Sequence, residues 1–122
     1  MDTLASALKR FTKRKHDWLL SRGSDVADPS RLSVGEKESF IDSLYQLHSK
    51  IFDGVERASF VSYVVDSPAD WTRIRIYKNN ADEWIGYCAV HRFSKLVFDR
   101  PYVIFRAEAG ILREYRGRSL TL

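Results

Sequence analysis

The sequence predicts an α+β domain, with N-terminal helices followed by a three-stranded antiparallel meander. Apolar residues recur at helical spacing in the first half of the chain, the apolar period changes to two after Trp71, and polar turns separate the later segments. Helices followed by a run of strands are typical of this class. The 122 residues, of which 44% are hydrophobic, suffice for one folded domain and are too few for two.

Residues 1–23 are expected to form a basic amphipathic helix. Apolar residues recur there at steps of three, four and seven with Lys and Arg between them, so the net charge of +4 belongs mainly to this segment. We interpret it as a helix that packs on the domain and exposes its cations to solvent. The same pattern allows binding to nucleic acid or to an anionic membrane, which no other feature of the sequence favours.

Residues 24–32 are rich in turn formers without periodicity and are predicted to be a linker. The domain proper is expected over residues 33–122. It begins at Ser33 and Glu36, whose spacing is that of a capping box, in which each residue accepts a backbone hydrogen bond from the other. The helix that they open should continue to about Phe52.

Residues 55–65 fit either a short helix or a strand. We favour the helix, because Asp66-Ser67-Pro68 would end it. The alternation that follows predicts an antiparallel hairpin over residues 72–93. Gly86 within it indicates a bulge or a close approach of two backbones. A third strand is expected over Tyr102–Leu112.

The segment after the third strand, Glu114-Tyr115-Arg116-Gly117-Arg118-Ser119, surrounds one glycine with arginines. Gly117 can adopt a positive φ and let the chain approach a bulky anion. Successive backbone N–H groups in such a turn can point at one ligand, and a following helix would add its dipole. The segment therefore predicts a binding site for a diphosphate group.

The same segment resembles the pyrophosphate loop of the GCN5-related N-acetyltransferase family, where the pattern Gln/Arg-x-x-Gly-x-Gly/Ala follows the fourth strand. Glu114 and Ser119 differ from the family's usual residues at the first and last positions. The preceding order is also similar, with two helices, a hairpin that contains Trp84-Ile85-Gly86-Tyr87, and a long strand. The resemblance covers about residues 33–122 and implies the N-terminal half of an acyl-CoA N-acyltransferase fold.

The resemblance implies acetyl-CoA or another acyl-CoA as co-substrate and an amine as acceptor. Backbone groups at the end of the third strand would pair with the pantetheine arm, and N–H groups of the turn would hold the pyrophosphate. The cofactor-binding residues implied in this way are Ile111, Leu112, Arg113, Arg116, Gly117, Arg118, Ser119, Leu120 and Thr121. Glu108, the only carboxylate on that strand, is the candidate base that removes the amine proton. An ion pair with Arg106, Arg73 or Arg75 is its structural alternative.

Members of the family continue beyond this loop with elements that complete the cleft. We therefore expect this chain to be the N-terminal piece of a longer acyltransferase or a remnant without activity, and to act as an N-acetyltransferase only within a longer chain. The alternative is a non-catalytic interaction module that uses the basic helix and an exposed sheet edge to bind a protein, a membrane surface or nucleic acid. A homodimer would be one way to cover that edge.

The single cysteine, Cys88, and the three histidines have no metal-ligand spacing, so no metal site is expected. Cys88 is interpreted as a small core residue. His91, on the same strand, fits either a group that titrates near a substrate or a hydrogen-bonded structural residue. With one thiol and no apolar run long enough to span a bilayer, a cytoplasmic location is expected.

Overall fold

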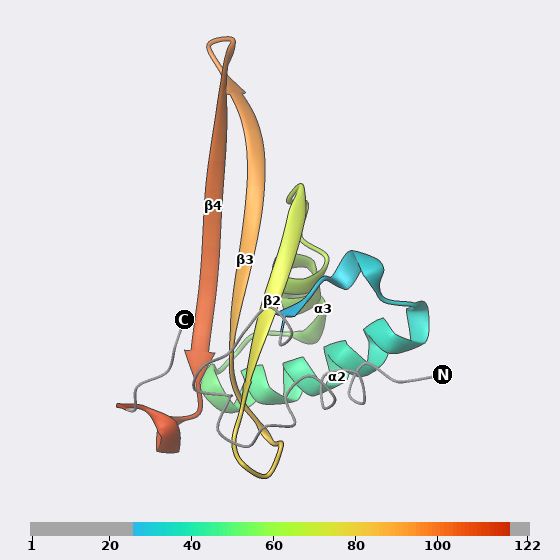
Figure 1. The fold of residues 1–122 in the computed structure, drawn as a ribbon, viewed down its shortest axis with the longest axis vertical. Helices are drawn as coiled ribbons and strands as arrows, with labels where there is room; N and C mark the ends of the chain where they lie inside the picture. Colours follow the sequence, from blue (N-terminus) through green and yellow to red (C-terminus); the bar gives the residue numbers. More distant parts are fainter. Residues whose placement is uncertain (1–25, 118–122) are drawn as a thin grey trace.

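The computed structural model describes residues 26–117 of the chain. It is an α+β fold with two helices and a four-stranded antiparallel sheet, in which the strands follow the order β1-β2-β3-β4 (Figure 1). The α+β class is thus confirmed, while the sheet has four strands rather than three. The basic helix predicted over residues 1–23 lies outside the described residues.

Helix α2 (Val34–Ile51) begins at the predicted capping box. The Ser33 hydroxyl accepts the N–H of Glu36 at 3.2 Å, and the Glu36 carboxylate accepts the N–H of Ser33 at 3.0 Å. The C-cap is Phe52, which confirms the predicted end. The side of the helix that packs into the core carries Phe40, Ile41, Leu44, Leu47 and His48.

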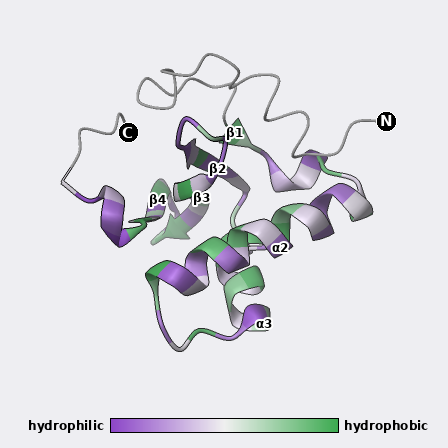
Figure 2. Cartoon of the chain, turned by 90° about the horizontal axis from the view of Figure 1, so that it is seen from below, coloured by the Kyte–Doolittle hydropathy of each residue, from purple (hydrophilic) through white to green (hydrophobic). Residues whose placement is uncertain are grey.

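The ambiguous segment 55–65 is helical, as predicted. Helix α3 (Arg57–Phe60) continues as a π-helical turn over Val61–Val65. The buried residues Phe60, Val64 and Val65 join the core. Figure 2 shows α2 and α3 on one side of the sheet. The sheet face toward these helices is therefore the face that can hold a buried polar site.

Strand β1 (Val26–Ala27) corrects the prediction of a linker over residues 24–32. Both of its residues pair antiparallel with β2 (Trp71–Lys78). A short 3-10 turn over Pro29–Arg31 follows, with the Asp28 side chain accepting at its N-terminus. A strand of two residues has no alternation of its own, so only its pairing with β2 identifies it.

Strand β2 and strand β3 (Trp84–Val97) form the predicted hairpin. Thr72, Ile74 and Ile76 are buried on the helix side of β2, which confirms the alternation. Gly86 marks a close approach of two backbones, because an added Cβ would lie 2.8 Å from the carbonyl oxygen of Gly110. Such a glycine allows β3 and the next strand to pack without a side chain between them.

Strand β4 (Arg100–Ile111) pairs with β3 along its whole length, and the two form a hairpin that projects well beyond the helices (Figure 1). β3 extends to Val97 rather than ending at Phe93. β2 pairs with β3 only as far as Arg92, and within residues 26–117 no strand pairs with the outer edge of β4. We call residues 93–105 the distal arm.

Candidate functional site

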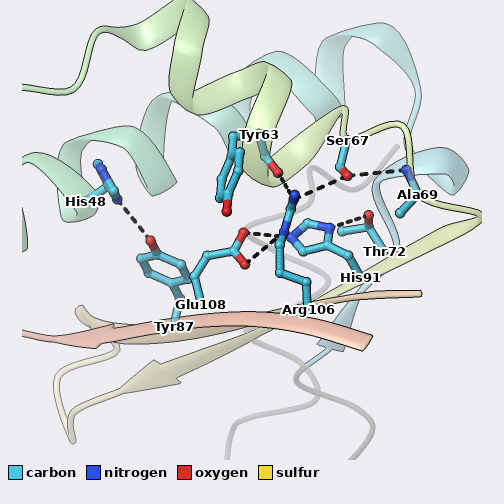
Figure 3. Close-up of polar contacts among 9 residues, drawn as sticks. All are labelled: His48, Tyr63, Ser67, Ala69, Thr72, Tyr87, His91, Arg106 and Glu108. Carbon is cyan, nitrogen blue, oxygen red and sulfur yellow. Dashed lines mark hydrogen bonds and ion pairs between the residues drawn. The ribbon is translucent and has the colours of Figure 1, made fainter. Parts of the chain in front are cut away.

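Glu108, the candidate base, lies in a hydrogen-bonded network on the helix side of the sheet (Figure 3). Its Oε1 atom lies 2.8 Å from Nε2 of His91, and Nδ1 of His91 lies 2.9 Å from the Thr72 hydroxyl. The register of β3 and β4 sets the contact, since Glu108 and His91 are diagonal neighbours on one face. His91 is 0% exposed and Glu108 is 19% exposed at the side chain. The sequence pointed to both residues and gave no sign that they touch.

Arg106 connects Glu108 to the helical layer. Its Nε atom lies 3.5 Å from Oε2 of Glu108. One terminal nitrogen donates to the Tyr63 carbonyl at 2.7 Å and to the Ser67 hydroxyl at 3.4 Å, while the guanidinium lies 3.8 Å from the centre of the Tyr63 ring. Strand β4 is therefore fixed to the π-helical turn at the level of the candidate base.

The partners of Glu108 limit the proton positions within this network. Because a carboxylate oxygen can only accept, Nε2 of His91 donates to Glu108, and when Nδ1 carries no proton it accepts a hydrogen bond from the Thr72 hydroxyl. The ion pair considered as an alternative for Glu108 is present with Arg106, whereas Arg73 lies 3.1 Å from Asp28 instead. The imidazole of His91 and the guanidinium of Arg106 orient the Glu108 carboxylate, which is compatible with a structural role and with a base.

A second buried polar pair joins the helical layer to the sheet. Nδ1 of His48 lies 2.9 Å from the hydroxyl of Tyr87 (Figure 3). Burial lowers the pKa of His48. Burial, helped by the negative charge of Glu108 and by Cys88, raises the pKa of Tyr87 to about 12. The pair is therefore neutral at ordinary pH, with the phenol able to donate to the imidazole.

Cys88 is half-buried and lies outside the buried core, so the prediction of a core residue is wrong: the alternation of β3 turns Tyr87 and Ala89 into the core and Cys88 to the opposite face. Burial raises the pKa of its thiol, the nearby Arg75 opposes that shift, and Glu108 adds to it. A thiol that stays protonated is a poor nucleophile. Among residues 26–117, no group of three or more His, Cys, Asp or Glu side chains is arranged to hold a metal ion.

The arginine-glycine turn directly follows β4, after a 3-10 turn over Arg113–Tyr115. Gly117 has a φ of 84° and open space around the position of a Cβ, as the diphosphate prediction requires. Two of the predicted amides are engaged within the chain: Leu112 donates to the Ile85 carbonyl at 2.8 Å and Arg116 to the Arg113 carbonyl at 3.1 Å. The first continues the sheet ladder and the second closes the turn, so neither faces a ligand.

Of the other residues predicted to bind the cofactor, some lie at the outer edge of β4 and the rest belong to the last residues of the sequence. The N–H and C=O groups of an antiparallel strand alternate in direction, so Ile111 presents both to the outer edge while Leu112 faces β3. The Arg116 side chain lies at this edge, since its Nε donates to the Ile111 carbonyl at 3.4 Å. Arg118, Ser119, Leu120 and Thr121 lie outside the described residues.

A cavity of about 590 Å³ lies between the end of α2, the start of β3 and the residues that follow β4. Its walls bring Lys50 and Arg113 together with Glu83 and Glu114. The Asn79 amide donates to the Tyr115 hydroxyl at 3.1 Å, which joins the turn before β3 to the turn after β4. The sequence did not indicate this cavity, because its walls come from segments far apart in the chain.

Comparison with known proteins does not identify a family for this chain. No protein-family model, no curated protein and no solved structure matches the chain. Among the described helices, none is both long and apolar enough to cross a membrane.

Proposed function

We propose that this domain binds acyl-CoA and belongs to an N-acyltransferase of the GCN5-related type. The observation that carries the proposal is the junction of two features at one point. The unpaired outer edge of β4 leads directly into a turn in which Gly117 has a positive φ and open surroundings. A strand edge can pair with the amides of a pantetheine arm, and a glycine turn flanked by arginines suits a pyrophosphate.

The position of this turn in the fold supports the proposal. In the family that the sequence resembles, the pyrophosphate loop follows the fourth strand. With β1 included, Arg100–Ile111 is the fourth strand of this sheet, and the arginine-glycine turn follows it. The expected pair of helices precedes the hairpin. Strand β1, which the sequence did not predict, thus brings the order of elements closer to the family pattern.

The cationic side chains around the turn favour an anionic ligand there. Arg116 lies at the open edge beside Ile111, and Arg113 and Lys50 line the adjoining cavity. Arginine side chains bind phosphate oxygens in pairs of parallel hydrogen bonds. Ile111 would form the strand-like contact with pantetheine, while the amides of residues 118–121, together with Gly117, would approach the pyrophosphate.

In this proposal Glu108 would accept the amine proton. Leu112 follows Glu108 by four positions of extended chain, a distance of about 13 Å. The amine nitrogen would attack the thioester carbonyl and the C–S bond would break. The CoA thiolate would leave, and the proton lost by the amine would pass to the Glu108 carboxylate. His91 and Arg106 would orient that carboxylate.

Isothermal titration calorimetry with acetyl-CoA and with free CoA tests the binding step directly. Gly117→Val should abolish the heat, because a β-branched residue cannot readily adopt the φ of 84°. Gly54→Val is the matched control, since Gly54 has a φ of 79° and equally open surroundings away from the turn. Binding by Gly54→Val but not by Gly117→Val would support the proposal. No heat from the unmodified chain would reject it.

An interaction module is the second candidate function, and the exposed side chains of the distal arm favour it. Leu96, Phe98 and Phe105 are 75%, 96% and 61% exposed. Large apolar side chains gathered on one projection are typical of a contact surface. No heat with CoA together with salt-sensitive retention on heparin or on anionic vesicles would favour this candidate over the first.

A further inference from the structure

The distal arm is a two-stranded ribbon that leaves the rest of the domain. Beyond the pair between Trp71 and Arg92, no strand of residues 26–117 pairs with β3 on the side of β2. Within the described chain, β4 has no partner on its other side. Figure 1 shows this part of the hairpin projecting past α2 and α3. A ribbon of two strands is marginally stable in water on its own, so a partner surface would stabilise it.

The apolar side chains of the arm are exposed on both of its faces. Side chains at successive positions of a strand point to opposite faces. Val103 and Phe105 therefore lie on one face of β4, and Tyr102 and Ile104 lie on the other. All four are between 47% and 61% exposed. The arm thus exposes apolar side chains on both faces, unlike a strand that buries one face against a second sheet.

The apex of the arm is its most apolar and most exposed part. Val97 pairs with Arg100, so Phe98 and Asp99 form a two-residue turn, and both have positive φ values, 50° and 61°. Asn and Gly are the usual residues of such a turn, and a bulky residue in this conformation is strained. The turn therefore holds a phenylalanine, 96% exposed, at the end of a projection where Asn would be more stable.

Cations flank this apolar apex. Lys95 and Arg100 lie on either side of it, and Arg92 follows further down β3. Asp99 is the single acid within residues 92–106. An apolar end with cations behind it matches a membrane surface, where the hydrocarbon boundary lies beneath anionic headgroups.

We propose that the distal arm inserts its apex into the headgroup region of an anionic membrane. Phe98, Leu96 and Val97 would reach the boundary of the acyl chains, and Lys95 and Arg100 would contact lipid phosphates and carboxylates. Insertion of about 5–10 Å is typical of peripheral membrane contacts. Three extended residues of an arm span about that length.

A second copy of the chain fits these observations less well. Pairing of two β4 edges would cover one edge of the ribbon and leave the apex, beyond the last strand pair, in water. It would also bring two arms with an excess of cations together. A nucleic acid would match the cations and the aromatic rings. It would leave the aliphatic side chains of Leu96, Val97 and Ile104 without a favourable contact, because aromatic rings and arginine are the groups that stack on bases.

Cosedimentation with vesicles tests the proposal. The full chain should bind phosphatidylcholine vesicles that contain about one third phosphatidylserine, bind pure phosphatidylcholine more weakly, and lose part of its binding at high salt. Phe98→Asn should lower the partition coefficient at least about tenfold. The same change should leave the thermal midpoint unchanged or raise it, because Asn suits a positive φ.

Val34→Asn is the matched control. Val34 is an apolar residue, 85% exposed, at the start of α2, a helix that lies away from the projecting end of the hairpin (Figure 1). The Val34→Asn variant should bind vesicles as strongly as the unmodified chain. Lys95→Gln and Arg100→Gln should each weaken binding about fivefold at low salt and little at high salt.

Three outcomes would overturn the proposal. The first is equal binding to anionic and neutral vesicles, or no binding to either. The second is vesicle binding that Phe98→Asn leaves unchanged, which would place the contact elsewhere. The third is the absence of vesicle binding together with a dimer in sedimentation velocity, or retention on nucleic acid, that Phe98→Asn removes. None of these readouts involves acyl-CoA, so failure here leaves the proposed function intact.

Discussion

The β3–β4 hairpin has two parts that share one backbone pairing and differ in their surroundings. In the proximal part, residues 84–92 and 106–111, β2 extends the sheet and the helices cover one face. In the distal arm neither is present. Ile85 is 1% exposed in the first part, while Ile104 is 48% exposed in the second. Backbone pairing alone does not bury side chains. The apolar residues of the arm would therefore be buried only by a partner, whereas those of the proximal part are already buried by β2 and the helices.

Two isoleucines of the same hairpin should differ most in their contribution to stability. Ile85→Ala should lower the free energy of unfolding by about 2–5 kcal/mol, because it opens a cavity in the core. Ile104→Ala should lower it by less than about 1 kcal/mol, because the side chain is already half exposed. Equilibrium urea denaturation measures both changes. Equal losses at the two positions would contradict the division of the hairpin.

The next effect concerns the network that fixes the proximal part. His91→Leu removes the partner of Glu108 and of the Thr72 hydroxyl, and should lower the free energy of unfolding by about 2–3 kcal/mol. Thr72→Val, which breaks only the outer hydrogen bond, should lower it by about 1 kcal/mol. The comparison is made by urea denaturation at neutral pH. A His91→Leu variant as stable as the unmodified chain would mean that the network contributes nothing.

The pH dependence of stability should also originate in the proximal part. Burial holds the pKa of His48 below its ordinary value of 6.5. The unfolded chain therefore binds a proton at a higher pH than the folded chain, and stability should fall as the pH drops from about 6.5 toward the folded pKa. In His48→Gln this part of the slope should disappear.

Two carboxylates should cause a separate loss of stability at lower pH. Hydrogen bonds from Ser33 lower the pKa of Glu36. Burial opposes ionisation of Asp28, yet hydrogen bonds from Ser30 and the cations Arg73 and Arg31 lower its pKa overall. The two carboxylates stabilise the folded chain at pH values above their ordinary pKa range. This stabilisation is lost as the pH falls through their pKa values in the folded chain. A profile that is flat from neutral pH down to this range would contradict the role given to His48.

The smallest effect compares the turns at the two ends of β3. Asp82 and Asp99 have φ values of 63° and 61°, so replacing either by glycine should relieve strain worth a few tenths of a kcal/mol. Asp82→Gly should raise the thermal midpoint slightly, because that turn adjoins the proximal part. Asp99→Gly should slow hydrogen exchange in the arm and leave the midpoint unchanged. Identical shifts in the midpoint would indicate that the arm unfolds together with the core.

The parts of the fold that depend on local chemistry could be predicted from the sequence. The capping box of Ser33 and Glu36 involves residues three apart, and the helix it opens follows from the spacing of apolar residues. The alternation in β2 reflects one buried and one wetter face. Gly86 was interpretable because a glycine inside a strand often marks a close backbone approach.

The parts that depend on distant pairing could not be predicted. Strand β1 exists through its register with β2, and two residues carry no pattern. The distal arm has no buried face, so its residues show no alternation from which its length could be judged. Glu108 and His91 are brought together by the β3–β4 register, which fixes which residues are diagonal neighbours only once the Phe98–Asp99 turn is known.

Acyl-CoA binding at the turn after β4 is best tested by hydrogen exchange with and without saturating acetyl-CoA, because one experiment covers both the turn and the distal arm. We expect slower exchange from Ile111 through Gly117 when the ligand is present, with no change over residues 93–105. Unchanged exchange throughout the turn would contradict acyl-CoA binding at this site. Slower exchange confined to the distal arm would contradict it as well, because the ligand would then bind at the opposite end of β4.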